Sequence, residues 1–379
     1  MRKAAHVNTH AGIAVTGCHA QLAAEEIIKT GSLAANRLAI VGNDRKDLLV
    51  THILEGKHQE DMPSDDLRTR SAEISMLPVS RFAGRTRAYL RIQDGCNSFC
   101  SYCIVPYTRG QSRSLPAGEV LEQAGKYAAA GHHEIVVTGI HVGQYGRDLN
   151  QADDIVTIME RLCNALPEIR FRLSSIEPLE ISSPLLSLMK NTDNFMPHLH
   201  IPLQSGDSHI LARMNRRYTS DQFLAIVQKC RAELPEAAIG IDVLVGFPGE
   251  SPEHFNNTRE LLERIDFSYL HVFPYSKRPG TKAAGFGDQV RKNVKAERVE
   301  ALRFLSEKNR LAFYTEHIGT TRTVLLENER DRSGLLKGFT DNYIPVLIDG
   351  DDTLKNRIVT VELDFLTGDS VQANLFDKQ

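Results

Sequence analysis

Between residues 88 and about 275, short apolar segments alternate with longer amphipathic ones. The short segments carry apolar residues at every second position, as at Ala88, Leu90 and Ile92, which predicts buried strands. The longer segments place apolar residues three and four positions apart, which predicts helices. The predicted strands are 88–92, 134–139, 170–174, 198–203, 239–246 and 269–273. The predicted helices are 116–130, 154–166, 184–190, 220–234 and 252–265, with Thr219 and Ser251 as candidate caps.

Such alternation is typical of an α/β fold with a parallel sheet and outer helices. Six strands are too few for a closed eight-stranded barrel, so we expect an open, partial (β/α)6 barrel. In barrels of this type the chemistry lies at the carboxyl ends of the strands. Polar or glycine-bearing motifs follow the predicted strands in this way, at 96–103, 139–141, 174–177, 204–206, 246–249 and 274–278.

The flanking regions have other patterns. Residues 1–60 contain a short βαβ fragment, and the polar stretch 61–87 is predicted to be a linker. The barrel region extends over 88–314 and ends in an amphipathic helix from about 285. Residues 315–379 carry short strands between Gly, Asp and Asn turns, which predicts a small β-barrel.

Composition excludes several classes. The chain has 379 residues with 41% hydrophobic and 25% charged residues, the balance of a soluble globular protein. It contains no membrane-length apolar run and no secretory signal, and its six cysteines therefore indicate a reducing cytoplasm. A net charge of −3 gives no overall attraction to nucleic acid, so RNA binding would depend on local cationic clusters.

Three cysteines follow the first barrel strand within eight positions. Cys96, Cys100 and Cys103 come directly after Gly95, on a predicted loop. A structural zinc site needs four ligands, and no second Cys-x-x-Cys exists in the sequence. Three thiolates are one short for an iron–sulfur cube, which leaves one iron open to another ligand. A thioredoxin-like pair at Cys100 and Cys103, or a disulfide, is the alternative.

The spacing Cys-x3-Cys-x2-Cys, with Tyr102 before the last cysteine, resembles the radical S-adenosylmethionine (SAM) signature. The resemblance implies a 4Fe–4S cluster whose open iron binds SAM and whose electron cleaves it to a 5′-deoxyadenosyl radical. Nearly the whole chain resembles the methylthiotransferase family within this superfamily. The motifs that carry the resemblance are Gln93–Gly110, Leu173–Pro178, His200–Gly206, Asp242–Glu250 and His271–Ser276.

Two further segments, Gln111–Ser114 and Thr138–Gly146, most resemble the branch that methylthiolates C2 of N6-threonylcarbamoyladenosine at tRNA position 37. The branch acting on isopentenyladenosine is the near alternative, and the branch modifying a ribosomal-protein aspartate is more distant. The resemblance implies tRNA as partner and an electron donor such as flavodoxin or ferredoxin. It implies no membrane partner, and the oligomeric state stays open.

The resemblance also suggests site residues. Cys18 corresponds to the last of three cysteines that hold a second cluster in the family, and the sequence begins after the other two, so we expect an amino-terminal truncation. A small buried thiol is the alternative for Cys18. The candidates for SAM contact are Tyr102, Gly139, Glu177, Gln204 and Asp242. Gly139 could instead only form a turn, Glu177 could cap a helix, and Asp242 could be a satisfied ion pair.

The carboxyl-terminal segment resembles the RNA-binding TRAM domain. The candidates for RNA contact are Arg322, Lys337, Phe339 and Tyr343, because cations and stacked aromatic rings bind RNA, with a core position as the alternative for Phe339. Two other functions stay open. One is a radical SAM enzyme that cleaves SAM without sulfur transfer, and the other is a non-catalytic tRNA-binding protein.

Overall fold

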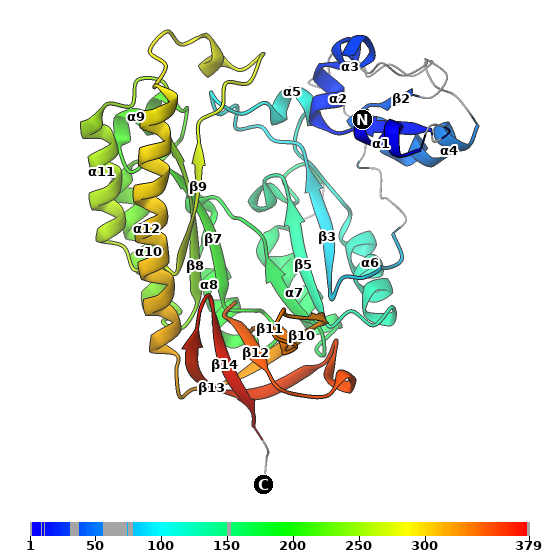
Figure 1. Cartoon of the computed structure of the whole chain (residues 1–379), viewed down its shortest axis with the longest axis vertical. Coiled ribbons are helices and arrows are strands. Elements are labelled where there is room, and N and C mark those ends of the chain that lie inside the picture. Colours follow the sequence, from blue (N-terminus) through cyan, green and yellow to red (C-terminus); the bar gives the residue numbers. More distant parts are fainter. Residues whose placement is uncertain are drawn as a thin grey trace.

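The computed structural model describes residues 2–8, 10, 12–30, 38–55, 74, 79–149 and 153–376. Figure 1 shows a small amino-terminal lobe, a central set of long strands with helices outside them, and a small barrel at one end of those strands. Most of the predicted linker 61–87 lies outside the described residues.

The central part contains the six predicted strands, and neighbouring strands pair in parallel. They are β3 (Arg87–Asp94), β5 (Glu134–Gly139), β6 (Arg170–Leu173), β7 (His198–Gln204), β8 (Ala238–Val245) and β9 (Tyr269–Pro274). Hydrogen bonds join them in two sets, β3-β5-β6 and β7-β8-β9. A bridge between Phe171 and Phe195 and a 2.9 Å bond from the Ile176 N–H to the His200 carbonyl connect the sets. The result is the open arrangement that the alternation predicts.

Five helices of nine residues or more follow strands of the sheet and bury their apolar faces. They are α6 (Ala117–Ala129), α7 (Ile155–Ala165), α8 (Ser183–Asn191), α10 (Ser220–Glu233) and α11 (Pro252–Glu263). Thr219 and Ser251 each form a capping box at the start of α10 and α11, which confirms both predicted caps. The core beneath them consists of outward-facing strand residues such as Ile92, Ile135 and Ile241.

Short elements and one long helix complete this part. Three short elements escaped prediction: α5 (Val105–Arg109), β4 (Arg113–Ser114) and α9 (Ser208–Arg213). Two to six residues are too few to display a period in the sequence. Helix α12 (Lys292–Glu316) lies beside β9 and leads into the small barrel (Figure 1).

The carboxyl-terminal residues form the predicted small β-barrel, closed in the order β10-β11-β12-β14-β13. Its strands are β10 (Thr321–Arg330), β11 (Leu336–Thr340), β12 (Pro345–Ile348), β13 (Ile358–Thr367) and β14 (Ser370–Leu375). Strand β14 was not predicted, because only its Val371 and Ala373 are buried and its other residues are polar or exposed.

The amino-terminal lobe has the predicted βαβ core, with β1 (Ile13–Thr16) and β2 (Leu38–Val41) in parallel. Its helices are α1 (Arg2–Val7), α2 (Cys18–Leu22), α3 (Ala24–Thr30) and α4 (Leu49–Leu54). Asn43 Nδ2 donates to the Thr108 carbonyl at 2.7 Å and thereby joins the lobe to α5. Within the described ranges, every helix is too short or too polar to span a bilayer.

Candidate active site

The cysteine loop begins where β3 ends, and Gly95 makes that transition possible. Gly95 has φ 77°, and a Cβ there would lie 1.9 Å from the Gln111 carbonyl oxygen. Any other residue would therefore clash with the backbone of the returning chain. The Cys96 N–H donates to the Gly110 carbonyl at 3.1 Å, which ties the two ends of the loop together.

The three thiols of the loop share one electrostatic environment. Burial, together with the neighbouring Cys100 and Cys96, outweighs a hydrogen bond from the Val105 N–H and raises the pKa of Cys103 to about 11. Hydrogen bonds to Cys96 outweigh its burial and lower its pKa; His141 Nδ1 lies 3.5 Å from its sulfur. All six cysteines of the sequence lie in the described ranges and are free thiols, so no disulfide forms here. The three thiols lie at the carboxyl ends of the barrel strands, here called the mouth of the barrel. Three neighbouring thiols there fit the donor set of an iron–sulfur cluster.

Tyr102 anchors the loop from below. It packs against an apolar cluster that includes Met214 and Phe247, and burial holds its pKa well above the usual value. The neighbouring Ser101 N–H donates to the Met214 carbonyl at 2.9 Å. The structure therefore gives Tyr102 a supporting position.

Gln93 joins the cysteine loop to the turn after β5. Its amide Nε2 donates to the Gly95 carbonyl and to Ser112 Oγ, both at 2.8 Å, and its Oε1 accepts from the His141 N–H at 2.8 Å. A Cβ on Gly139 would lie 2.8 Å from this Oε1. The close approach predicted at Gly139 therefore serves the Gln93 side chain. The sequence motif at 139–141 indicated this position but not its partner.

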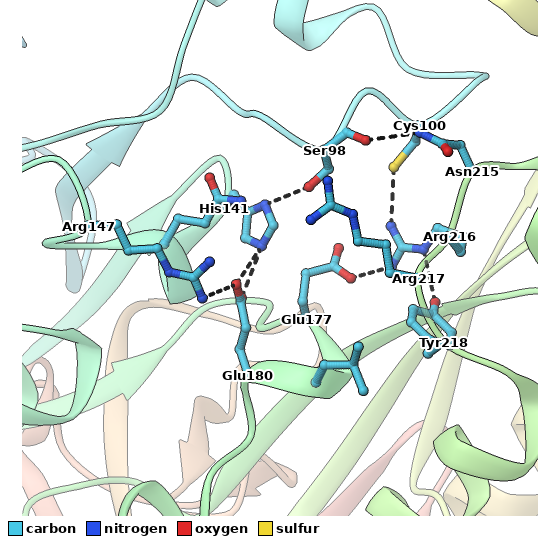
Figure 2. A pocket seen from close by; sticks show the side chains of 12 residues that line it. Ser98, Cys100, His141, Arg147, Glu177, Glu180, Asn215, Arg216, Arg217 and Tyr218 are labelled. Carbon is cyan, nitrogen blue, oxygen red and sulfur yellow. Dashed lines mark hydrogen bonds and ion pairs between the residues drawn. The ribbon is translucent and has the colours of Figure 1, made fainter.

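Beside the thiols lies a cavity of about 190 Å³ with charged walls (Figure 2). His141 Nε2 lies 3.0 Å from both carboxylate oxygens of Glu180, and this contact and the one to Cys96 outweigh burial and raise the pKa of His141 to about 9. The cavity is lined by Ser98, Cys100, His141, Gln144, Arg147, Glu177, Leu179, Glu180, Asn215, Arg216, Arg217 and Tyr218.

Arg216 is the central cation of this cavity and was not predicted. Its side chain is 6% exposed, forms an ion pair with Glu177, and places NH1 3.5 Å from Cys100 Sγ. Burial raises the pKa of Cys100, and the Arg216 guanidinium offsets part of that increase by favouring the thiolate. Glu177 therefore lies in the cavity as predicted, already paired within the protein. The signal in the sequence was an arginine pair, Arg216-Arg217, which begins three residues after the end of α9 at Arg213.

Gln204 and Asp242 have different surroundings. Gln204 ends β7 with φ 66°, a left-handed conformation that is rare outside glycine. Asp242 lies inside β8, three residues before its end at Val245, and contacts His200 and His271. The predicted alternative of a satisfied ion pair describes Asp242 better than a place at the mouth.

The four residues predicted to contact RNA mostly face the protein. Arg322 pairs with Glu236 at 2.8 Å, and Lys337 lies 3.3 Å from Glu329. Phe339 and Tyr343 stack on each other with ring centres 4.9 Å apart. The guanidinium of Arg87 lies 4.7 Å from the Phe339 ring centre, and that of Arg172 lies 4.9 Å from the Tyr343 ring centre. These contacts attach the small barrel to the base of the large one.

Cys18 lies against α5, the helix that follows Cys103. Its pKa is lowered, because hydrogen bonds from Thr108 and Arg109 outweigh its burial. Asn43 Nδ2 lies 3.9 Å from its sulfur. The structure therefore places Cys18 at the same end of the molecule as the cysteine loop (Figure 1).

An open parallel barrel with three thiols at the carboxyl end of its first strand defines a radical SAM protein. The sequence profile described as "Radical SAM superfamily" matches residues 90–262. A solved structure of the radical SAM methyltransferase TsrM from Kitasatospora setae superposes with a TM-score of 0.51 at 16% identity, over 69% of this chain and 55% of that one. That likeness supports the fold.

Curated relatives narrow the class. The threonylcarbamoyladenosine tRNA methylthiotransferases of Bacillus subtilis and Rickettsia prowazekii are each 37% identical, over 96% and 92% of this chain and 80% of their own lengths. A tRNA-2-methylthio-N(6)-dimethylallyladenosine synthase of Pelotomaculum thermopropionicum is 38% identical, over 75% of this chain and 64% of its own length. The chain therefore belongs to the tRNA methylthiotransferase family of radical SAM proteins, whose cofactors include a 4Fe–4S cluster and SAM.

Proposed function

We propose that this protein is an enzyme that methylthiolates C2 of N6-threonylcarbamoyladenosine at position 37 of tRNA. The observation that carries the proposal is the loop of three coupled thiols beside Arg216 and a charged cavity, in a chain of this family. At similar coverage of this chain, the relatives named for threonylcarbamoyladenosine are 37% identical over 96% and 92%, whereas a dimethylallyladenosine synthase of Fusobacterium nucleatum is 31% identical over 93%, which supports the choice of substrate.

In this proposal Cys96, Cys100 and Cys103 hold the 4Fe–4S cluster. When bound, the cluster supplies an open iron for SAM and the electron that cleaves its sulfonium. Arg216 donates to Cys100 and stabilises its thiolate. Gln93 fixes the backbone on which Cys96 lies, through its bond to Gly95.

We also propose roles for the remaining site residues. Glu177, which lines the cavity, and Gln204, which ends β7, are proposed to accept hydrogen bonds from the amine or ribose hydroxyls of SAM, while Tyr102 and Gly139 act by supporting the loop. Cys18 is proposed as a ligand of a second cluster, which needs further thiolates because one cannot hold it. We propose an electron donor such as flavodoxin or ferredoxin, and a cytoplasmic location.

The domain limits are also proposed: 1–60 as the amino-terminal methylthiotransferase part, 61–87 as linker, 88–314 as the radical SAM domain and 315–379 as a TRAM-like RNA-binding domain. The closed five-stranded barrel at the carboxyl terminus supports the assignment of the TRAM-like domain. Arg322, Phe339 and Tyr343 contact residues of the large barrel, whereas the ion pairs of Lys337, with Glu327 and Glu329, lie within the small barrel, so Lys337 is the candidate best placed for RNA.

The test is anaerobic reconstitution with iron and sulfide, followed by incubation with SAM, a strong reductant and tRNA carrying threonylcarbamoyladenosine. Chromatography should detect 5′-deoxyadenosine, and mass spectrometry of digested tRNA should detect the 2-methylthio product once further thiolates complete the second cluster; Cys100→Ala should abolish both. Cys163, a buried residue of α7, offers the matched control, since Cys163→Ala should keep both. SAM cleavage without thiolated tRNA would leave only a radical SAM enzyme, and intact SAM would refute the assignment.

A further inference from the structure

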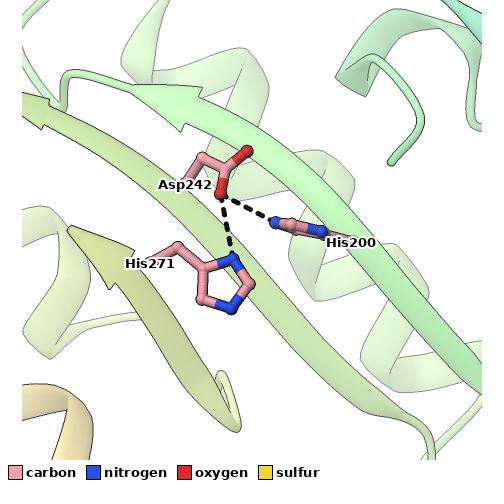
Figure 3. A group of neighbouring side chains, drawn as sticks. All are labelled: His200, Asp242 and His271. Atoms are coloured by element: carbon pink, nitrogen blue, oxygen red, sulfur yellow. Dashed lines mark hydrogen bonds and ion pairs between the residues drawn. The ribbon is translucent and has the colours of Figure 1, made fainter. Parts of the chain in front are cut away.

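The inner face of the second strand set carries a polar cluster below the mouth. Asp242 of β8 lies between His200 of β7 and His271 of β9 (Figure 3). Its Oδ1 is 2.8 Å from His200 Nε2 and 3.4 Å from His271 Nδ1. Asp242 lies three positions before the end of β8 at Val245, which places the cluster about 10 Å below the strand ends.

Asp242 fixes the orientation of both rings. Burial raises the pKa of Asp242, but hydrogen bonds from His200 and His271 bring it down to about 2. A carboxylate only accepts, so each imidazole directs an N–H toward it. The opposite nitrogen of His271, Nε2, therefore points away from Asp242. The His271 side chain is 49% exposed, whereas that of Asp242 is 19% exposed.

An aromatic ring lies above His271 on the same face of β9. Phe273 is two residues further along the strand, is 50% exposed, and has its ring centre 6.4 Å from that of His271. The intervening Val272 is buried in the core under the helices. Exposed aromatic rings stack well on nucleic-acid bases, including bases taken out of their stack.

We infer that His271, oriented by Asp242, recognises the carboxylate of the threonylcarbamoyl group while the adenine of the same nucleotide stacks on Phe273. The inference rests on the proposed function, which brings position 37 to the mouth of the barrel. In adenine, C2 and the N6 substituent lie on either side of N1, so a base that presents C2 to the mouth can direct this substituent down the wall. In the complex the doubly protonated His271 ring lies between two carboxylates, donating from Nδ1 to Asp242 and from Nε2 to the carboxylate of the substituent, and His200 lies beside it.

The same cluster disfavours the alternative substrate. A dimethylallyl group has no polar atom, so placing it here would remove water from His271 without replacing the lost hydrogen bond. The three side chains also lie close enough to hold a cation, with their ligand atoms within 4.8 Å of one another. However, His200 Nε2 is hydrogen-bonded to Asp242 Oδ1 at 2.8 Å and His271 Nδ1 lies 3.4 Å from the same oxygen, so both nitrogens have a partner without a cation.

The test uses anticodon stem-loop RNAs that differ only at position 37, which carries adenosine, its threonylcarbamoyl derivative, the methyl ester of that derivative, or dimethylallyladenosine. Dissociation constants are measured by fluorescence anisotropy with the anaerobically reconstituted protein. A hydrogen bond to a charged group predicts about 10-fold tighter binding of the free carboxylate than of adenosine. The ester should lose this preference, and so should His271→Asn with the free carboxylate. His209→Asn, on the exposed side of α9, is the matched control and should keep it.

The outcomes separate the inference from the proposed function. Equal binding of acid and ester by the wild-type protein overturns the inference even if His271→Asn does not fold. An unchanged preference in His271→Asn also overturns it. The same holds if the wild-type protein binds one equivalent of divalent metal and His271→Asn loses this metal while it keeps the preference. Wild-type protein that prefers the free carboxylate yet leaves SAM intact would support the inference and refute the proposed function.

Discussion

Glu134 at the base of the large barrel offers the sharpest test of what holds the two barrels together. Its carboxylate is fully buried and lies 2.9 Å from Arg172, 3.0 Å from Arg87 and 4.0 Å from Arg170. The first two of these arginines also carry the aromatic rings of Phe339 and Tyr343 on the small barrel. Glu134→Gln keeps the shape of the side chain and removes only its charge.

The expected cost follows from burial. Leaving buried charges without their partner costs about 3–5 kcal/mol, because the remaining guanidiniums cannot regain water. Arg87 keeps Glu327 at 3.1 Å, so the lower end of that range applies. A loss of this size lowers the melting temperature by roughly 10 °C in a domain of this size. Thermal unfolding followed by circular dichroism measures the shift.

The pH dependence gives a second measurement of the same interaction. The arginines, Arg172 first, outweigh burial and lower the pKa of Glu134 from its usual 4.5. A depressed pKa stabilises the folded state above pH 4.5, and the stabilisation is lost as the pH falls toward the folded pKa. The gap between wild type and Glu134→Gln should therefore be constant near neutrality and narrow below pH 4.5.

The control is Glu122→Gln, whose exposed carboxylate contacts Lys126 at 2.7 Å. It should leave the melting temperature unchanged, because exposed ion pairs contribute little. Hydrogen exchange should also show faster opening around Phe339 and Tyr343 in Glu134→Gln. Equal melting temperatures for the two variants would refute the reasoning that the buried charge cluster is an obligatory network.

Three other predictions concern the loop, the cavity and the base. Gly95→Ala should abolish iron incorporation, because its Cβ would clash with the Gln111 carbonyl, whereas Gly118→Ala, in open space on α6, should bind iron normally. Iron analysis measures both variants, and equal iron contents would contradict the predicted clash. Arg216→Gln should slow SAM cleavage at least about 10-fold, because it removes the charged donor to Cys100, while the exposed Arg259→Gln should not. Chromatography of 5′-deoxyadenosine measures the rate of cleavage, and similar rates for the two variants would exclude this role of Arg216. Phe339→Ala should lower the melting temperature more than Phe365→Ala, because Phe339 contacts the Arg87 guanidinium whereas the Phe365 ring is 53% exposed. Calorimetry measures both melting temperatures, and equal decreases would argue against the cation–π contact.

Local patterns in the sequence predicted those features that depend only on residues close together along the chain, such as strands, helix starts and the cysteine loop. The alternation at Ala88, Leu90 and Ile92 fixed a strand, and the capping boxes at Thr219 and Ser251 marked two helix starts. The cysteine spacing indicated the cluster loop for the same reason. These signals are short-range, so one sequence contains them in full.

The partners of these residues could not be predicted, because they come together only in the folded chain. Arg216 lies beside Cys100 because α9 returns under the cysteine loop, and no spacing in the sequence records that return. His271 was quoted as part of a motif, yet its contact with Asp242 depends on the register of β8 and β9. Phe339 and Tyr343 were interpreted as surface aromatics, because the face of a small barrel that meets another domain has no separate pattern.

The large barrel is closed at its base but open along one side, and this shape has a consequence for how an RNA could reach it. Tyr343 and Phe339 close the base through Arg172 and Arg87, while the strands stop short of a full circle and Phe273 stays half exposed on the inner wall. A folded RNA loop can thus deliver a single nucleotide from the flank. Neither threading of a chain end nor separation of the two barrels is required between one turnover and the next.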